Sequence, residues 1–134
     1  MSGVLLDSDV IIEVLRRRDP DILESWVELA DSREAVLCSP VTVAEIFHGM
    51  RDREKDATER VLSVITCLPI GEEIGRRAGD YLRIFHRSHA LALGDALIAA
   101  TASTHDLLLW TRNRKHYPMK DLRFFGDRHR TRSR

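Results

Sequence analysis

The chain has 134 residues, enough for one domain with a single hydrophobic core but not comfortably for two. Lys plus Arg and Asp plus Glu number 21 each, so the chain is not a strongly basic protein, and any affinity for nucleic acid must come from local clusters. No apolar run approaches the roughly 20 residues of a membrane span, and the N-terminus lacks the pattern of an export signal, so we expect a cytoplasmic protein with no membrane partner.

The first elements alternate short apolar strands with amphipathic helices. Residues 4–6 predict a buried strand that stops at Asp7-Ser8-Asp9, and apolar residues at helical spacing follow up to residue 18. Asp19-Pro20 begins a second helix, because Pro suits a first-turn position. Residues 35–38 predict a second buried strand.

The middle of the chain continues the alternation. A helix starts near Thr42, where Thr42-x-x-Glu45 also fits a capping box. Residues 56–66 predict another helix, and residues 67–70 a weak strand, because Pro69 cannot donate to a ladder. Cys38 and Cys67 have no C-x-x-C spacing, and we expect both to be reduced core residues.

The last third contains the strongest signals. Residues 72–89 predict a long amphipathic helix, and a helix that begins near Asp95 ends near residue 104 or 105. Residues 107–111 form an unbroken apolar run typical of a buried strand, and residues 122–125 suggest a final short strand. We therefore expect one domain over residues 1–125 and a basic tail over residues 126–134, either disordered or able to bind nucleic acid.

This alternation predicts an α/β domain with three layers, α/β/α, around a short parallel sheet. In such a sheet the strand ends and the following helix starts meet at the carboxyl edge, where ligands bind. That edge should gather Asp7, Glu45, Asp95 and Asn113. Asp7 and Asp9 also fit helix capping, but only one Asp is needed for a cap.

Three or four carboxylates in one place repel each other unless a cation compensates them. Oxygen ligands without clustered Cys or His favour a hard ion, so Mg²⁺ is expected, with Mn²⁺ as a substitute, rather than zinc. Such an ion suits phosphoryl chemistry with water as the nucleophile. The sequence has no phosphate-binding G-x-x-x-x-G-K-[ST] loop.

Four segments in this order resemble the PIN-domain ribonuclease toxins of VapBC-type toxin–antitoxin pairs: LLDSDVIIEVL, SPVTVAEIFHGM, GDALIAATA and LLLWTRNRKHYP. The resemblance runs along nearly the whole chain. It implies a PIN-like fold and a metal-dependent endoribonuclease that hydrolyses structured RNA, a tRNA or a ribosomal loop. It also implies a homodimer and a VapB-like antitoxin, giving a heterotetramer or larger complex. The antitoxin's C-terminal segment would lie in a groove between the early helices. Candidates for both the core and that groove, which the sequence alone does not divide, are Ile11, Val14, Leu15, Trp26 and Phe47.

The resemblance also assigns roles to residues. Asp7, Glu45 and Asp95 would hold the metal, Asn113 would orient them or the substrate, and Thr111 would steady the turn. Accessory roles fall to Asp9 and His116, and phosphate contacts to Arg112 and Arg114. The chain departs from the family in two places: many relatives carry a further Asp in the turn where this chain has His116, and Asp9 stands where Asn or Ser is common.

Two other readings stay open. Asp7-Ser8-Asp9 after a strand also resembles haloacid-dehalogenase-type phosphatases, in which Asp7 would be the nucleophile and Asp9 a general acid. Alternatively, the acids only cap helices and the chain is a non-catalytic binding module.

Overall fold

Strands and helices alternate along the chain, as the apolar pattern predicts. The computed structural model describes residues 3–126. The strands are β1 (Gly3–Leu6), β2 (Ala35–Cys38), β3 (Thr66–Cys67), β4 (Leu108–Trp110) and β5 (Arg123–Phe124). The helices are α1 (Ser8–Arg16), α2 (Pro20–Asp31), α3 (Pro40–Gly49), α4 (Lys55–Leu62), α5 (Glu72–His89) and α6 (Leu93–Thr104), with short 3₁₀ turns at η1 (Asp52–Glu54) and η2 (Arg114–His116).

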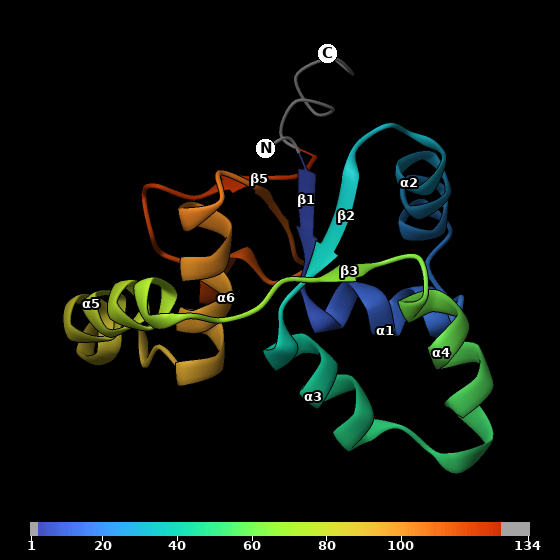
Figure 1. Cartoon of the computed structure of the whole chain (residues 1–134), viewed down its shortest axis with the longest axis horizontal. Coiled ribbons are helices and arrows are strands. Elements are labelled where there is room, and N and C mark those ends of the chain that lie inside the picture. Colours follow the sequence, from blue (N-terminus) through green and yellow to red (C-terminus); the bar gives the residue numbers. More distant parts are fainter. Residues whose placement is uncertain (1–2, 127–134) are drawn as a thin grey trace.

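Within the described residues the strands form one parallel sheet in the order β3-β2-β1-β4-β5. The chain builds the sheet outward from β1 to β2 and β3, and then crosses to the other side of β1 to add β4 and β5 (Figure 1). The order therefore reverses between β1 and β4, and ligands of parallel sheets bind at such a switch point.

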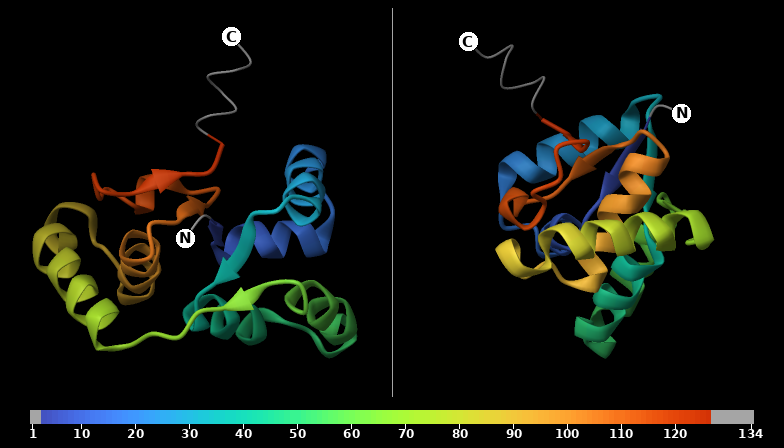
Figure 2. Two further views of the ribbon diagram at one scale, coloured as in Figure 1. Left: turned by 45° about the horizontal axis from the view of Figure 1, so that its top comes forward. Right: turned by 90° about the vertical axis from the view of Figure 1, so that its left-hand side faces the viewer.

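Helices cover both faces of the sheet, which confirms the predicted three layers. Leu5 points to the face covered by α5 and α6, whereas Val4 and Leu6 point to the face covered by α1 and α2. Figure 2 shows the two helical layers on opposite sides of the strands. The small residues of α6, among them Ala96, Ala99 and Ala100, are fully buried and let this helix pack closely on the sheet.

Two element boundaries differ from the predictions. The helix predicted for residues 56–66 ends at Leu62, and the strand predicted for residues 67–70 is β3. The reason is pairing: Cys67 lies in register with Cys38, and the Leu68 amide still donates to the Cys38 carbonyl at 2.9 Å. Pro69 has no amide proton and cannot extend the ladder.

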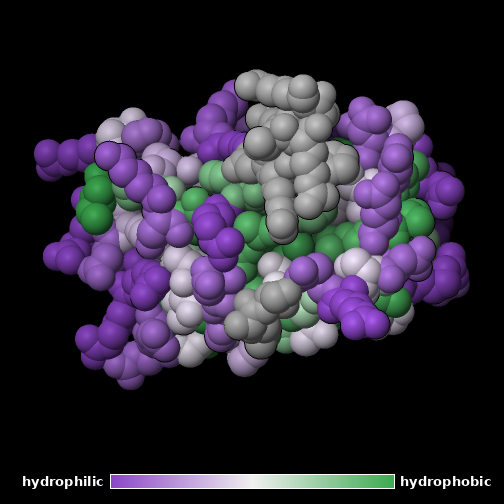
Figure 3. Space-filling model, turned by 90° about the horizontal axis from the view of Figure 1, so that it is seen from above, coloured by the Kyte–Doolittle hydropathy of each residue, from purple (hydrophilic) through white to green (hydrophobic). Residues whose placement is uncertain are grey.

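The surface at the amino ends of the strands, seen from above, exposes apolar residues between hydrophilic flanks (Figure 3). The predicted site lies at the opposite edge. No helix within residues 3–126 is long and apolar enough to cross a membrane. Apart from Gly126, the predicted basic tail lies outside the described residues, so the domain boundary at residue 125 stays a prediction.

Candidate active site

Asp7 follows β1 directly and is held from three sides. Its backbone amide donates to the Trp110 carbonyl of β4 at 2.9 Å, and its Oδ1 accepts the Ser8 amide at 2.8 Å, which caps α1. Its Oδ2 accepts the Tyr117 hydroxyl at 2.7 Å and the Thr111 hydroxyl at 2.9 Å. Asp7 is therefore a helix cap, as the structural reading predicts, and also a buried carboxylate, only 7% exposed, at the carboxyl edge.

The turn after β4 is built around Thr111. The Thr111 hydroxyl, besides donating to Asp7, lies 3.4 Å from Asp9 Oδ2 and accepts the Asn113 amide at 3.1 Å. The Arg112 amide donates to the same Asp9 oxygen at 3.1 Å. The other carboxylate oxygen, Asp9 Oδ1, is buried and has no hydrogen-bond partner among the described residues. Thr111 thus steadies the turn, and Asn113 lies half-buried at its end.

Tyr117 is the functional candidate that the sequence analysis missed. It is 3% exposed, and its hydroxyl lies 3.5 Å from Asp95 Oδ1 as well as donating to Asp7. One hydroxyl therefore contacts carboxylates from two elements. Burial, followed by the charge of Asp7, raises the pKa of Tyr117, so the phenol keeps its proton and remains a donor. The sequence feature that could have identified Tyr117 is an aromatic residue four positions after Asn113, at the end of a short turn.

Glu45 is not the helix cap that the sequence pattern allows. Ser39 caps α3 by accepting the Val41 amide at 3.1 Å, with Pro40 in the first turn. This places Glu45 in the second turn of the helix, exposed, with the Ser8 side chain as a hydrogen-bond partner. The capping-box interpretation of Thr42 and Glu45 is therefore wrong, and capping does not account for a glutamate at position 45.

Asp95 lies in the first turn of α6. A Cβ atom at the preceding Gly94 would lie 3.2 Å from Val41 Cγ1, so glycine permits the close approach of α6 to α3 that brings Asp95 toward Glu45. His116 Nδ1 lies 3.8 Å from Asp95 Oδ2. His116 thus stands beside an acid of the site.

The acids of this edge influence each other's ionisation. Burial, and then the negative charge of Asp7, raise the pKa of Asp9 to about 6. Burial also raises the pKa of Asp95, with Asp7 adding to the effect and His116 opposing it. The pKa of Glu45 is raised by burial and by the charges of Asp7 and Asp95, against the hydrogen bond from Ser8. The edge therefore carries more negative charge than its own donors compensate.

The donor set fits a hard divalent cation. Its side chains offer mainly carboxylate oxygens, with the His116 imidazole beside Asp95, and this oxygen-rich set favours a hard cation over zinc. Within residues 3–126 no three acidic, His or Cys side chains already stand close enough together to hold one ion. The orphaned Asp9 Oδ1 and the raised pKa values are the observations that indicate a missing positive charge.

Arg112 and Arg114 both have partners inside the domain. Arg112 Nη1 lies 3.1 Å from Glu13 Oε2, and Arg18 contacts the same oxygen at 3.1 Å. Glu13 is only 3% exposed, so the two arginines compensate a buried charge and tie the turn to α1. Arg114 donates to the Phe125 carbonyl at 3.1 Å and lies over the Phe124 ring.

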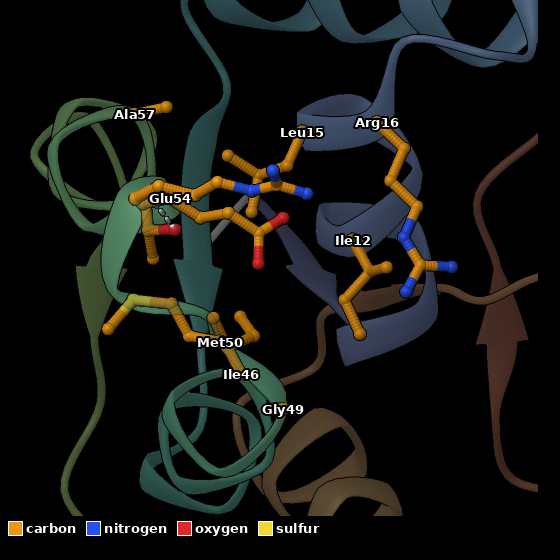
Figure 4. A pocket seen from close by; sticks show the side chains of 10 residues that line it. Ile12, Leu15, Arg16, Ile46, Gly49, Met50, Glu54 and Ala57 are labelled. Atoms are coloured by element: carbon orange, nitrogen blue, oxygen red, sulfur yellow. Dashed lines mark hydrogen bonds between the residues drawn. The ribbon is translucent and has the colours of Figure 1, made fainter.

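A cavity of about 320 Å³ opens between α1, α3, η1 and α4. Apolar side chains of Ile12 and Leu15 face Met50 across it, and the Glu54 carboxylate points into it (Figure 4). Of the residues predicted to form the core or the groove, Leu15 lines this cavity, and Ile11 and Val14 belong to the core.

Comparison with known proteins gives one consistent answer. The family model of the PIN domain matches residues 4–122. Ribonuclease VapC10 of Mycobacterium tuberculosis is 42% identical over 117 residues, which are 87% of this chain and 86% of that protein. The crystal structure of FitAcB from Neisseria gonorrhoeae matches with a TM-score of 0.72 at 27% identity, covering 94% of this chain and 99% of that one. VapBC2 from Rickettsia felis, bound to a DNA fragment from its promoter, shares the fold with a TM-score of 0.78 at 18% identity, covering 93% and 98%.

Proposed function

The chain belongs to the PIN-domain family, and from that premise we propose that it is a metal-dependent endoribonuclease, the toxin of a type II toxin–antitoxin pair. The observation that carries the proposal is the under-compensated acidic edge formed by Asp7, Asp9, Glu45 and Asp95 at the switch point of the sheet. The relative named Ribonuclease VapC10 supports the same activity. Family membership leaves the phosphatase and the non-catalytic module without support.

We propose Mg²⁺ as the cation, with Mn²⁺ as a substitute. Asp7, Asp95 and Glu45 would hold it, and Asp9 offers the free oxygen that could compensate for the acid absent from the turn. When bound, a divalent cation lowers the pKa of a water molecule and neutralises charge that grows on the phosphate.

The remaining chemistry belongs to the side chains. Thr111 and Tyr117 fix the orientation of Asp7, and the ordered turn sets the position of Asn113. The oxygen of a water molecule would attack the phosphorus of the RNA backbone and pass a proton to an ionised carboxylate of the edge, while the bond from phosphorus to the leaving ribose oxygen breaks. His116, exposed beside Asp95, is placed to give that oxygen a proton. Arg112 and Arg114, which lie in and just after the turn, would hold flanking phosphates.

The proposed partner is a VapB-like antitoxin that blocks this activity. Its inserted segment would occupy the cavity between α1, α3 and α4 and bury apolar side chains against Ile12, Leu15 and Met50. The homodimer and its heterotetramer or larger complex with the antitoxin are part of the same proposal. The substrate would be a cytoplasmic tRNA or a ribosomal loop.

Asp95→Asn tests the proposal. The variant should fold and lose RNA cleavage in Mg²⁺, because it removes a charge that the cation needs. Asp31→Asn, an exposed change at the end of α2, is the matched control and should cleave like the wild type. Sequencing the RNA ends produced by brief expression without the antitoxin would identify the target. A folded Asp95→Asn variant that cuts RNA at the original rate would refute the assignment.

A further inference from the structure

The chain's cysteines, Cys38 and Cys67, lie opposite each other on adjacent strands. Cys38 is the last residue of β2, Cys67 is the last residue of β3, and the two are register partners in the parallel ladder. Neighbouring strands lie about 4.8 Å apart, and a disulfide requires Cα atoms about 4.4–6.8 Å apart. Register partners also project their side chains to the same face of a sheet. The backbone therefore already satisfies the main requirement for a bond between these sulfurs.

The side chains are in contact, and their environments differ. The thiol of Cys67 is a hydrogen-bond partner of the Cys38 thiol. Cys38 is 1% exposed, whereas Cys67 is exposed on the edge strand, which corrects the expectation that both are core residues. Burial, and then the neighbouring Cys67, raise the pKa of Cys38 to about 12. An oxidant in solution therefore meets Cys67 first, and Cys38 is reached only through Cys67.

We propose that Cys67 and Cys38 form a dithiol site that hydrogen peroxide oxidises to an intrachain disulfide, which a dithiol reductant converts back to the two thiols. In the first step the Cys67 sulfur attacks the peroxide, a sulfur–oxygen bond forms, the oxygen–oxygen bond breaks, and hydroxide leaves to take up the proton of the Cys67 thiol. In the second step the Cys38 sulfur attacks the sulfenic sulfur of Cys67, the sulfur–sulfur bond forms, and the hydroxyl leaves as water with the Cys38 proton. Together the thiols lose two electrons and two protons, and the peroxide becomes two waters.

The position of the pair gives the bond a structural consequence. The disulfide closes a loop over residues 39–66, which contains α3 with Glu45, the turn η1 and the helix α4. This loop also supplies most of the residues around the cavity, including Ile46, Met50 and Glu54. Closing a loop restricts the unfolded chain, so the oxidised protein should resist denaturant more than the reduced protein. The inference needs only the two thiols and does not depend on the proposed nuclease activity.

The test is peroxide treatment of the full-length reduced protein, followed by thiol counting in denaturant, peptide mass spectrometry and trapping of sulfenic acid with dimedone. The wild type should lose both thiols, yield a peptide that links Cys38 to Cys67, take up no dimedone and recover both thiols with dithiothreitol. Cys38→Ala should carry a dimedone adduct on Cys67, because the resolving thiol is absent. Cys67→Ser should keep its Cys38 thiol unreacted. The urea midpoint of the oxidised wild type should exceed that of the reduced form, with no such difference in either variant.

Several results would overturn the proposal. These are a dimedone adduct or a sulfinic acid on Cys67 of the wild type with Cys38 still reduced, disulfides only between chains, or full retention of both thiols under peroxide that oxidises free glutathione. Each of these is read on the wild type, so the proposal stays open to refutation even if a variant does not fold.

Discussion

The free energy of unfolding should rise when Asp9 is replaced by Asn in the metal-free protein. The pKa of Asp9 is about 6 in the folded chain against 3.8 for an ordinary Asp, so ionisation of Asp9 opposes folding. Two units correspond to about 3 kcal/mol at about 1.4 kcal/mol per unit. Because Asp9 is partly exposed and screened by solvent, we expect a gain of about 1–2 kcal/mol at pH 7. Asn keeps an acceptor for the Arg112 amide and the Thr111 hydroxyl.

The pH dependence provides the sharper check. Between the unfolded pKa of 3.8 and the folded pKa of about 6, the folded state binds more protons than the unfolded state. The contribution of Asp9 to stability is therefore unfavourable at neutral pH and disappears as the pH falls through this window. The advantage of Asp9→Asn should drop to about half at pH 5, measured by urea denaturation in EDTA. Asp31→Asn should change stability by no more than a few tenths of a kcal/mol at either pH. Loss of stability in Asp9→Asn at pH 7, or a gain that does not depend on pH, would show that the folded state does not disfavour ionisation of Asp9.

Three further substitutions test other contacts, each beside a control. Tyr117→Phe should lower the free energy of unfolding by about 1–2 kcal/mol and reduce RNA cleavage. Tyr81→Phe, which loses hydrogen bonds to Ser103 and Asp121, should lower stability without affecting cleavage, and equal cleavage by the two variants would show that Tyr117 is not part of the site. Arg112→Ala should lower the free energy of unfolding by about 1–3 kcal/mol, because it leaves the buried Glu13 carboxylate with one arginine fewer. Arg76→Ala breaks an exposed ion pair and should stay within about 0.5 kcal/mol of wild type; similar losses in the two variants would contradict a buried pair. Leu15→Arg places a charge in the cavity and should abolish binding of the cognate antitoxin in calorimetry, whereas Ile84→Arg, on the exposed face of α5, should leave binding intact. Undiminished binding by Leu15→Arg would exclude the cavity as the docking site.

The fold could be predicted from the sequence because short apolar runs and amphipathic periodicity mark each element locally, and general topology rules then arrange these elements. Short buried strands between amphipathic helices require a parallel sheet, and a parallel sheet requires that Asp7 and Asp95 approach its carboxyl edge. The bounds of α5 followed directly from its periodic apolar face. Boundaries failed where pairing overrode the pattern, as at β3, whose two residues are fixed by β2.

The details of the site depended on contacts that no local pattern carries. Thr42 and Glu45 match a capping box as well as Ser39 and Pro40 match a capped start, and only the preference of Pro for the first turn separates the two. Tyr117 lies 110 residues from Asp7, so its position just after the turn could mark it as a candidate but could not show that it bonds to Asp7. The arginine cluster predicted phosphate contacts but could not reveal the buried Glu13 that engages Arg112.

The distribution of hydrogen bonds at the carboxyl edge of the sheet explains why the negative charge there is better balanced by a bound cation than by the chain's own donors. Donors are concentrated on Asp7, which receives the Ser8 amide and the hydroxyls of Thr111 and Tyr117. Asp9 Oδ2 accepts the Arg112 amide, but Asp9 Oδ1 has no donor among residues 3–126. Asp7 is thereby fixed in place while the net charge around it stays negative, a combination that favours a pre-oriented ligand for a metal ion. Protons compete with that ion for the acids of raised pKa, so its affinity should fall as the pH drops below about 6.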